Sequence, residues 1–316
     1  MLAVGTRHRV RLVDAATGIV KWEEHSDRGA NTDISRVIMS PNGRFLASVS
    51  IFEEFWKLFD SASGVVCMTG ARHDGTGACA CTVTLDGSRE SLDEGCPVRA
   101  HTGTLNAVAY SPCGHRLATG GEDCAVILWD AGTGKAEQVL QGHTQRVTSV
   151  SFSANGARLA SGSYDSSIRV WDTVTGGLLR TIPLAHDDRV FPTFRVHFSP
   201  TDSRILASTG GDGLTARQWD VESGKLINSV KGCRFAVFSP DGRSIATASA
   251  NNFGDVELVD AASGALLLSM VGHLGHVYSS SFSPNGAKLA SASYDGTCRV
   301  WDLSTGALLR TIELGS

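Results

Sequence analysis

Ser, His and Asp are abundant in this chain, and these three residue types can together form a nucleophilic triad. On paper, His143, Ser161 and Asp165 could supply one. In such a triad the serine oxygen attacks a carbonyl, the histidine takes the serine's proton, and the carboxylate orients the histidine. The sequence has no G-x-S-x-G, G-x-x-x-x-G-K-[ST] or H-E-x-x-H motif, and Gly75-Thr76-Gly77 is too short for a dinucleotide site. It therefore predicts no enzyme activity and no catalytic residue.

A second set of residues could bind a metal. Cys67, Cys79, Cys81 and Cys96 lie close together in the chain, and His73 lies among them. Zinc ligands usually come in pairs separated by about two to four residues, whereas Cys79 and Cys81 are separated by Ala80 alone. Small thiols in a reducing compartment are the simpler interpretation. We therefore expect no metal and no cofactor.

Composition limits the classes of partner. The chain has 316 residues, of which 42% are hydrophobic, and its formal net charge is −4. This weak negative charge provides no field that attracts polyphosphates, so nucleic acid is not an expected partner. No apolar run approaches membrane-spanning length, and Arg7, His8 and Arg9 stand where a signal peptide would be apolar. We expect a cytoplasmic protein without a membrane partner, with the nucleus left open.

The chain is built by repetition. Residues 149–182 recur at 279–312, with 24 of 34 positions identical. Looser copies lie between these two. The aspartate that ends each unit along the chain is Asp14, Asp60, Asp130, Asp172, Asp220, Asp260 or Asp302. A period in the low forties is typical of a four-stranded propeller blade.

Each unit predicts four short antiparallel strands. In the best unit, small or apolar residues alternate with polar ones over 147–153, and 158–162, 168–171 and 178–182 follow as further strands. Turn residues separate them, among them Asn155-Gly156 and Thr175-Gly176. Ser-Pro-x-Gly turns recur in register at 40–43, 111–114, 239–242 and 283–286. No helical period competes, so we predict an all-β fold.

These units resemble the WD40-repeat family of β-propellers. The family's name dipeptide occurs as Trp129-Asp130, Trp171-Asp172, Trp219-Asp220 and Trp301-Asp302, and its Gly-His element occurs at 142–143 and 272–273. Ala100-His101 and Ala185-His186 are close variants of that element. The resemblance covers nearly the whole chain.

The resemblance implies a buried tetrad of His, Ser or Thr, Asp and Trp in several blades. A Trp N–H only donates and a carboxylate only accepts, so a hydroxyl and an imidazole between them can satisfy every group. This structural role is favoured over a triad for His143, Ser161 and Asp165. The implied tetrads are His101, Thr119, Asp123 and Trp129; His143, Ser161, Asp165 and Trp171; His186, Ser208, Asp212 and Trp219; and His273, Ser291, Asp295 and Trp301.

Seven blades in a single domain, 1–316, are predicted. The first blade is expected to lack its innermost strand, because Leu2-Ala3-Val4-Gly5 aligns with the second strand of a unit. Residues 71–96 are interpreted as an insertion, with a degenerate eighth blade as the alternative. The predicted blades cover approximately 1–24, 34–69, 101–140, 143–182, 186–230, 233–270 and 273–313.

The resemblance implies a non-catalytic scaffold that binds peptides or protein surfaces, and a place in a multiprotein complex fits such a role. In this family the face formed by the loop before the first strand and the turn before the third strand is the usual binding site. Tyr and Arg are enriched in interface hot spots. The candidate residues on this face are Glu122, Arg146, Tyr164, Arg189, His276 and Tyr294.

Two alternatives stay open. Some members are substrate-recognition subunits of ubiquitin ligases, and these often carry an Arg two residues after the Trp-Asp pair. Here that place is taken by Gly132, Val174, Glu222 and Ser304. The other alternative is a sensor or regulatory region of a larger signalling protein, which would also explain the incomplete first blade.

Overall fold

The fold is known from a computed structural model in which every described element is a β-strand. The described residues are 1–5, 9–14, 17, 19–25, 34–50, 56–70, 82–83, 90–91, 101–184, 193–210, 215–230, 233–249 and 254–313. In this part of the chain, no helix has the length and apolar character needed to span a bilayer.

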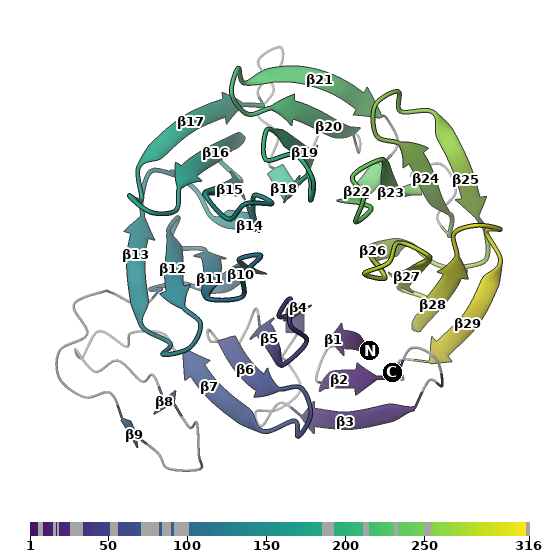
Figure 1. Cartoon of the computed structure of the whole chain (residues 1–316), viewed down its shortest axis with the longest axis horizontal. Coiled ribbons are helices and arrows are strands. Elements are labelled where there is room, and N and C mark those ends of the chain that lie inside the picture. Colours follow the sequence, from purple (N-terminus) through teal and green to yellow (C-terminus); the bar gives the residue numbers. More distant parts are fainter. Residues whose placement is uncertain are drawn as a thin grey trace.

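Within these ranges the strands form seven antiparallel sheets, or blades, arranged in a ring (Figure 1). Blade 1 contains β1 (Leu2–Gly5), β2 (Arg9–Val13) and β3 (Val20–His25). Blade 2 contains β4 (Ile34–Met39), β5 (Phe45–Ser50), β6 (Trp56–Asp60), β7 (Val66–Gly70), β8 (Thr82–Val83) and β9 (Glu90–Ser91). Blade 3 contains β10 (Leu105–Tyr110), β11 (Arg116–Gly121), β12 (Val126–Asp130) and β13 (Ala136–Leu140).

Blades 4 to 7 each have four strands in sequence order, from the central channel outwards. Blade 4 contains β14 (Val147–Phe152), β15 (Arg158–Ser163), β16 (Ser167–Asp172) and β17 (Leu178–Pro183). Blade 5 contains β18 (Thr193–Phe198), β19 (Ile205–Gly210), β20 (Thr215–Asp220) and β21 (Lys225–Val230). Blade 6 contains β22 (Cys233–Phe238), β23 (Ser244–Ser249), β24 (Val256–Asp260) and β25 (Leu266–Met270). Blade 7 contains β26 (Val277–Phe282), β27 (Lys288–Ser293), β28 (Thr297–Asp302) and β29 (Leu308–Glu313).

The seven-bladed, all-β prediction is confirmed, and within the described residues blade 1 has no innermost strand, as expected. Among the described residues blade 1 has three strands, and β1 pairs with β2 on one side only. The expected insertion at 71–96 is described only in part. Its two short strands, β8 and β9, extend blade 2 beyond its outer strand β7, outside the ring (Figure 1).

The core lies between neighbouring blades rather than within one sheet. Leu128 and Leu140 of blade 3 pack in one buried cluster with Phe152, Leu159 and Trp171 of blade 4. Each blade therefore covers the apolar face of the next, and no blade buries its own core alone.

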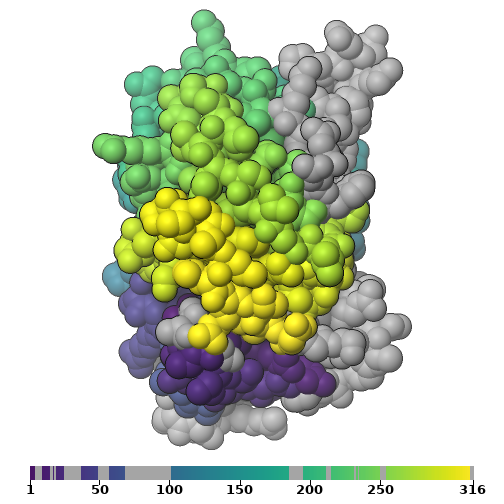
Figure 2. Space-filling view, turned by 90° about the vertical axis from the view of Figure 1, so that its right-hand side faces the viewer, coloured from purple at the N-terminus to yellow at the C-terminus, as the bar shows by residue number. Residues whose placement is uncertain are grey.

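The ring closes between the last blade and the first. Val13 of β2 shares a buried cluster with Val300 and Ile312 of blade 7, and the Arg310 guanidinium donates to the Thr17 carbonyl at 2.9 Å. The side view shows the C-terminal blade in yellow lying directly against the N-terminal blade in purple (Figure 2).

The aspartate that ends each third strand shapes the turn to the fourth. The Asp172 carboxylate accepts the Val174 and Thr175 N–H groups at 2.9 and 2.7 Å, and the Gly176 N–H bonds the Asp172 carbonyl at 2.9 Å. Gly176 has φ 71°, in the left-handed region that glycine tolerates best. This explains why the repeat keeps both an Asp and a Gly four residues later.

Replacing that glycine should destabilise the protein. A Cβ on Gly176 would sit in a left-handed backbone and 2.9 Å from the Gln138 Oε1. We expect Gly176→Ala to lower the free energy of unfolding by about 1–2 kcal/mol, measured by urea denaturation. The control is Gly132→Ala. The equivalent position in other blades holds Val174 or Ser304, and a Cβ on Gly132 would lie at van der Waals distance from its nearest neighbour. Equal losses for the two variants would contradict the turn assignment.

Candidate protein-binding face

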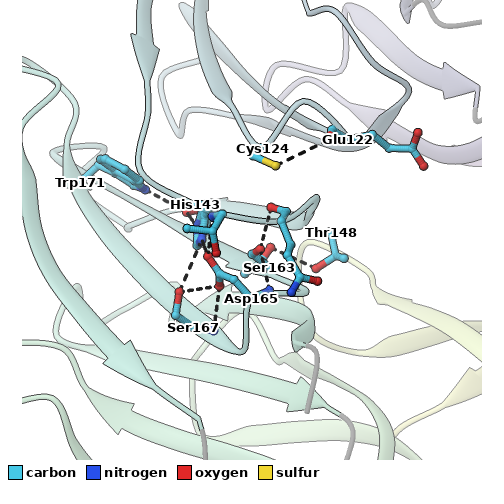
Figure 3. A network of polar contacts seen from close by, with 12 residues as sticks. Glu122, Cys124, His143, Thr148, Ser163, Asp165, Ser167 and Trp171 are labelled. Atoms are coloured by element: carbon cyan, nitrogen blue, oxygen red, sulfur yellow. Dashed lines mark hydrogen bonds and ion pairs between the residues drawn. The ribbon is translucent and has the colours of Figure 1, made fainter. Parts of the chain in front are cut away.

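Blade 4 holds a chain of hydrogen bonds that joins four buried or nearly buried side chains (Figure 3). The Trp171 Nε1 lies 2.8 Å from the Ser161 Oγ, which lies 2.7 Å from the His143 Nε2. The His143 Nδ1 lies 2.7 Å from the Asp165 Oδ2. The indole N–H must donate, so the serine oxygen accepts it and the serine hydroxyl donates to Nε2. The Nδ1–H is then left to donate to the carboxylate, and every group is satisfied.

The same chain of contacts recurs in blades 3 and 7. The indole-to-hydroxyl distance is 2.7 Å in blade 3 and 2.8 Å in blade 7, and the hydroxyl-to-imidazole distances are 2.8 and 2.7 Å. The imidazole-to-carboxylate distance is 2.9 Å in both. The residues are His101, Thr119, Asp123 and Trp129 in blade 3, and His273, Ser291, Asp295 and Trp301 in blade 7.

Blade 5 shows the part of its predicted tetrad that the structure describes. The Trp219 Nε1 donates to the Ser208 Oγ at 2.8 Å. The other two predicted members, His186 and Asp212, lie outside the described residues.

This geometry does not suit a catalytic triad. The Ser161 side chain is fully buried, and its oxygen already accepts the indole N–H of Trp171. A nucleophile must reach its substrate. The buried Ser161 hydroxyl is instead a link between Trp171 and His143.

The tetrad carboxylate also ties together the two loops of the candidate face. The Asp165 Oδ2 accepts the Thr144 N–H at 3.1 Å, from the loop before the first strand. The Asp165 Oδ1 accepts the N–H and hydroxyl of Ser167 at 3.0 and 2.6 Å, which ties the turn before the third strand to the first residue of that strand. Asp123 and Asp295 hold the same loop in their blades through the N–H groups of Thr102 and Leu274. Each tetrad therefore fixes the backbone that carries the candidate binding residues.

The protonation states fit this network. Burial alone would raise the pKa of Asp165, but hydrogen bonds from His143 and Ser167 outweigh burial and place that pKa well below the usual 3.8. The pKa of Asp295 is lowered in the same way against burial, by Thr297, the Leu274 N–H and His273. Burial lowers the pKa of His273 below 6.5 although Asp295 opposes this. A neutral imidazole beside an ionised carboxylate is the state the chain of donors requires, because a protonated Nε2 could not accept the serine hydroxyl.

Three of the predicted face residues meet between blades 3 and 4. The Arg146 guanidinium lies over the Tyr164 ring, 3.8 Å from its centroid, and the Arg146 Nη1 lies 3.7 Å from the Glu122 Oε1. Arg146 and Glu122 are exposed, and Tyr164 is half-buried. A guanidinium stacked on a ring keeps its outward edge and remaining donors available to a partner.

A second group lies on blade 7. Tyr294 is 77% exposed, and its ring centroid lies 5.1 Å from that of Tyr278. Leu274, on the neighbouring loop, is 91% exposed. The Tyr294 N–H bonds the His276 carbonyl at 3.0 Å, as the Tyr164 N–H bonds the Arg146 carbonyl in blade 4. The remaining candidate, Arg189, lies outside the described residues.

In blades 3, 4 and 7 the residue directly after the tetrad aspartate has a left-handed backbone conformation. The sequence indicated this conformation in blade 7 only. Gly296, after the tetrad aspartate of blade 7, has φ 80°, whereas Cys124 and Ser166 hold the same left-handed region with φ 64° and 61°. Gly296 is a recognisable signal for such a turn, but Cys124 and Ser166 are not. The repeat alignment with Gly296 was the one clue that could have identified them.

The suggested metal cluster cannot be assembled from what the structure describes. Cys67 is a buried free thiol, and His73, Cys79, Cys81 and Cys96 lie outside the described residues. Within the described part of the chain, no three His, Cys, Asp or Glu residues are grouped so as to hold a metal ion.

Comparisons with known proteins agree with the repeat. The family described as WD domain, G-beta repeat matches residues 95–130, 134–172 and 264–302. WD repeat-containing protein 1 of Bos taurus is 35% identical over 98 residues, which are 30% of this chain and 15% of that protein.

Two relatives match a longer stretch. Nuclear distribution protein PAC1 of Coccidioides posadasii is 30% identical over 247 residues, covering 68% of this chain and 51% of that protein. Autophagy-related protein 16 of Arabidopsis thaliana is 27% identical over 219 residues, covering 68% of this chain and 42% of that protein. The chain thus spans at most about half the length of these relatives.

Removing a tetrad carboxylate should lower stability. Asp165→Ala leaves the buried Nδ1–H of His143 and the Thr144 N–H without their acceptor. We expect a loss of about 1–3 kcal/mol in the free energy of unfolding, seen as a lower melting temperature in calorimetry. The control is Glu222→Ala, which removes an exposed carboxylate paired with Arg158 and should cost less than about 1 kcal/mol. Equal melting temperatures for Asp165→Ala and the parent would count against the tetrad.

Acid should destabilise the fold, with a sign set by the lowered pKa values. The unfolded chain protonates His273 near pH 6.5, whereas the folded protein does so only at lower pH. The contribution of His273 to the free energy of unfolding is therefore complete above pH 6.5 and declines below it. Asp165 and Asp295 add a further loss as the pH falls below 3.8. We expect the free energy of unfolding, from urea denaturation, to fall less steeply from pH 6.5 to about 4.5 in His273→Gln than in the parent. An identical slope in both proteins would refute this.

Proposed function

Because the chain belongs to the WD40-repeat family of β-propellers, we propose that it is a non-catalytic scaffold that recognises peptides or protein surfaces. Recognition takes place on the face formed by the loop before the first strand and the turn before the third strand of the blades. The partner is a protein or peptide, held within a larger complex.

The single observation that carries this proposal is the exposed Tyr, Arg and Leu set on one rigid face. Arg146 is stacked on Tyr164 in blade 4, beside Glu122 of blade 3, and Tyr294 and Leu274 project from blade 7. Tyr164 and Tyr294 each directly precede a tetrad aspartate, so they occupy the same position in blades three apart in the ring. A partner that contacts both must span the mouth of the channel.

The charges and apolar side chains of this face favour a partner whose surface carries both a charged group and an apolar group. Arg146 offers a cation beside the carboxylate of Glu122, whereas the blade 7 group offers aromatic and aliphatic surface. A guanidinium and aromatic rings are the types that dominate binding energy at protein interfaces, because each combines contact area with directed hydrogen bonds. A peptide with an acidic residue separated from an apolar anchor fits this arrangement.

The test compares affinity capture by the parent with capture by the triple variant Arg146→Ala, Tyr164→Ala and Tyr294→Ala. We expect the proteins recovered by the parent to fall by at least about tenfold with the variant, since each truncated hot spot costs about 2 kcal/mol. The measurement is quantitative mass spectrometry, followed by calorimetry with the purified partner.

A matched control separates the two faces of the ring. Lys135, Arg204 and Lys225 are exposed on the hairpin turns at the opposite ends of the strands. The variant Lys135→Ala, Arg204→Ala and Lys225→Ala should recover the same proteins as the parent. If it loses them, or if the first variant keeps them at parental levels, the proposed face is wrong.

A further inference from the structure

A cavity lies between blades 5 and 6, which stand side by side in the ring (Figure 1). Ala216 and Gln218 of blade 5 line one side of it, and Ile245, Thr247 and Val259 of blade 6 line the other. Including its open mouth, the cavity has about 250 Å³ of empty space, but it can enclose only a group of about the size of a water molecule. A ligand that fits must therefore place a small group inside and leave the rest in the mouth.

The repeat explains why the cavity is at this boundary. Trp171 of blade 4 packs against Ala118 and Leu140 of blade 3, so the tryptophan of a blade fills the space toward the preceding blade. In blade 6, Val259 takes the tryptophan position and leaves part of that space unfilled. Ala216 on the facing blade is also smaller than its equivalents, which are Val126, Ile168 and Val256.

Gln218 is a polar residue at a position that is apolar in the other six blades. Its equivalents are Leu12, Leu58, Leu128, Val170, Leu258 and Val300. Gln218 is 7% exposed, and its Nε2 donates to the Ala261 carbonyl at 2.6 Å. Among the described residues none donates to its Oε1. The cavity is therefore lined by an unpaired acceptor on a buried side chain, and such an acceptor costs stability until a donor reaches it.

The charge at another repeat position is reversed on the blade 6 side. Glu257 is the cross-strand partner of Thr247, which is fully buried and lines the cavity. Directly opposite residues of a sheet point to the same face, so the Glu257 side chain lies beside the cavity. Its equivalents in the other blades are five cations and one isoleucine: Arg11, Lys57, Arg169, Arg217, Arg299 and Ile127.

A second carboxylate lies on the same face. Asp255 directly precedes β24, and its carbonyl accepts the Ser249 N–H at 3.1 Å, so the extended pairing continues to it. Side chains two residues apart along a strand share a face, which places Asp255 with Glu257. Asp255 is 9% exposed, and within the described part of the chain neither carboxylate has a hydrogen-bond or ion-pair partner. Unpaired carboxylates with little access to water are costly, so this face favours a cationic ligand.

The missing indole, Gln218 and the acidic pair together select the chemistry of that ligand. The unpaired groups, which are the Gln218 Oε1 and the two carboxylates, all accept hydrogen bonds, so the ligand must donate them. A lysine ammonium donates three hydrogen bonds from a group of about the size of a water molecule, whereas an arginine guanidinium is a larger planar fork. The side chains of Ala216, Ile245 and Val259 can cover an aliphatic stem, because lysine stems pack along apolar surfaces.

We propose that the ammonium pocket, defined as the cavity together with Gln218, Asp255 and Glu257, binds a lysine side chain of a partner polypeptide. The stem lies against the apolar walls, and the ammonium donates to the Gln218 Oε1 and pairs with the Glu257 carboxylate. In blades 1, 2, 4, 5 and 7 the chain itself supplies a cation at the position of Glu257, and here the partner supplies it. The pocket shares no residue with the exposed Tyr, Arg and Leu set, so neither proposal rests on the other.

The test titrates the full chain, labelled at the methyl groups of Ala, Ile and Val, with the peptide Ac-Gly-Gly-Lys-Gly-Gly-NH2 and follows the methyl NMR signals. We expect the methyl signals of Ala216, Ile245 and Val259 to shift with a Kd on the order of 1 mM, as for a single anchored side chain. Control peptides with Nε-acetyl-lysine or arginine in place of the lysine should bind at least about tenfold more weakly. The first lacks the charge, and the head group of the second exceeds the pocket.

Variants on both blades locate the binding. Glu257→Gln removes the charge and Gln218→Leu removes the acceptor, and each should weaken binding of the lysine peptide by at least about tenfold. Gln218→Leu introduces the residue that blades 1, 2, 3 and 6 carry at this position, so the fold is kept and the loss of binding reports on the pocket. Glu313→Gln, which changes an exposed carboxylate on the outer strand β29, should keep the parental affinity. The triple variant of the loop face should also bind the peptide as the parent does, which separates this proposal from the proposed function.

Four results would overturn the proposal. The first is the absence of shifts at the three methyl-bearing residues with about 10 mM lysine peptide, and the second is equal binding of either control peptide. The third is parental affinity in Gln218→Leu or Glu257→Gln. The fourth is tighter binding of n-butylamine than of the lysine peptide, which would assign the pocket to a free amine rather than to a partner polypeptide.

Discussion

The structure depends on keeping a buried carboxylate ionised. Asp165 is largely withdrawn from water, and an unpaired charge there would be costly. His143, Ser167 and the Thr144 N–H compensate by donating to its oxygens. Since His143 and Thr144 belong to the loop before the first strand and Ser167 begins the third strand, satisfying one charge fixes both segments to the turn that carries Asp165. The rest of the tetrad, from Ser161 to Trp171, extends this constraint to the third strand of the blade.

The second constraint is that each blade covers its neighbour. A sheet with one apolar face cannot be stable alone, so a residue's exposure reports on the adjacent blade as much as on its own sequence. The strands β14 and β26 demonstrate this, because both contain the sequence Ser-x-Ser-Phe while Ser151 is buried and Ser281 is exposed. Repeat copies are therefore useful internal controls, because a difference in burial between them reports a difference in the neighbouring blade.

Much of the fold follows from local patterns in the sequence. The predicted strand at 147–153 appears as β14 (Val147–Phe152), and the predicted turn at Asn155-Gly156 has its glycine at φ 70°. Such features depend on side-chain alternation and turn chemistry within about ten residues. The repeat then carried them to the other blades, and the Leu2-Ala3-Val4-Gly5 match identified the incomplete blade.

Contacts between blades could not be predicted in this way. The approach of Arg146 to Glu122 depends on the angle between blades 3 and 4, which no local pattern contains. The hydrogen bond from the Arg195 guanidinium to the Tyr278 carbonyl, at 3.0 Å, joins the inner strands of blades 5 and 7 and spans 83 residues of sequence. Residue types suggested the candidate face, but only the arrangement of the ring shows which of its members meet.

Blade 6 shows how a blade can be stable without the tetrad. In blade 6, Val259 takes the place of the tryptophan and is buried, and the hydroxyl at the serine position, on Thr247, lies 3.5 Å from the Glu257 carbonyl. Replacing both partners of a buried polar pair by apolar groups can be nearly neutral for stability. Among the described residues the complete tetrad is seen in blades 3, 4 and 7, where Glu122, Tyr164 and Tyr294 each directly precede the tetrad aspartate. In these three blades the tetrad aspartate accepts a backbone N–H group two residues later, so the tetrad fixes the turn that carries a candidate residue.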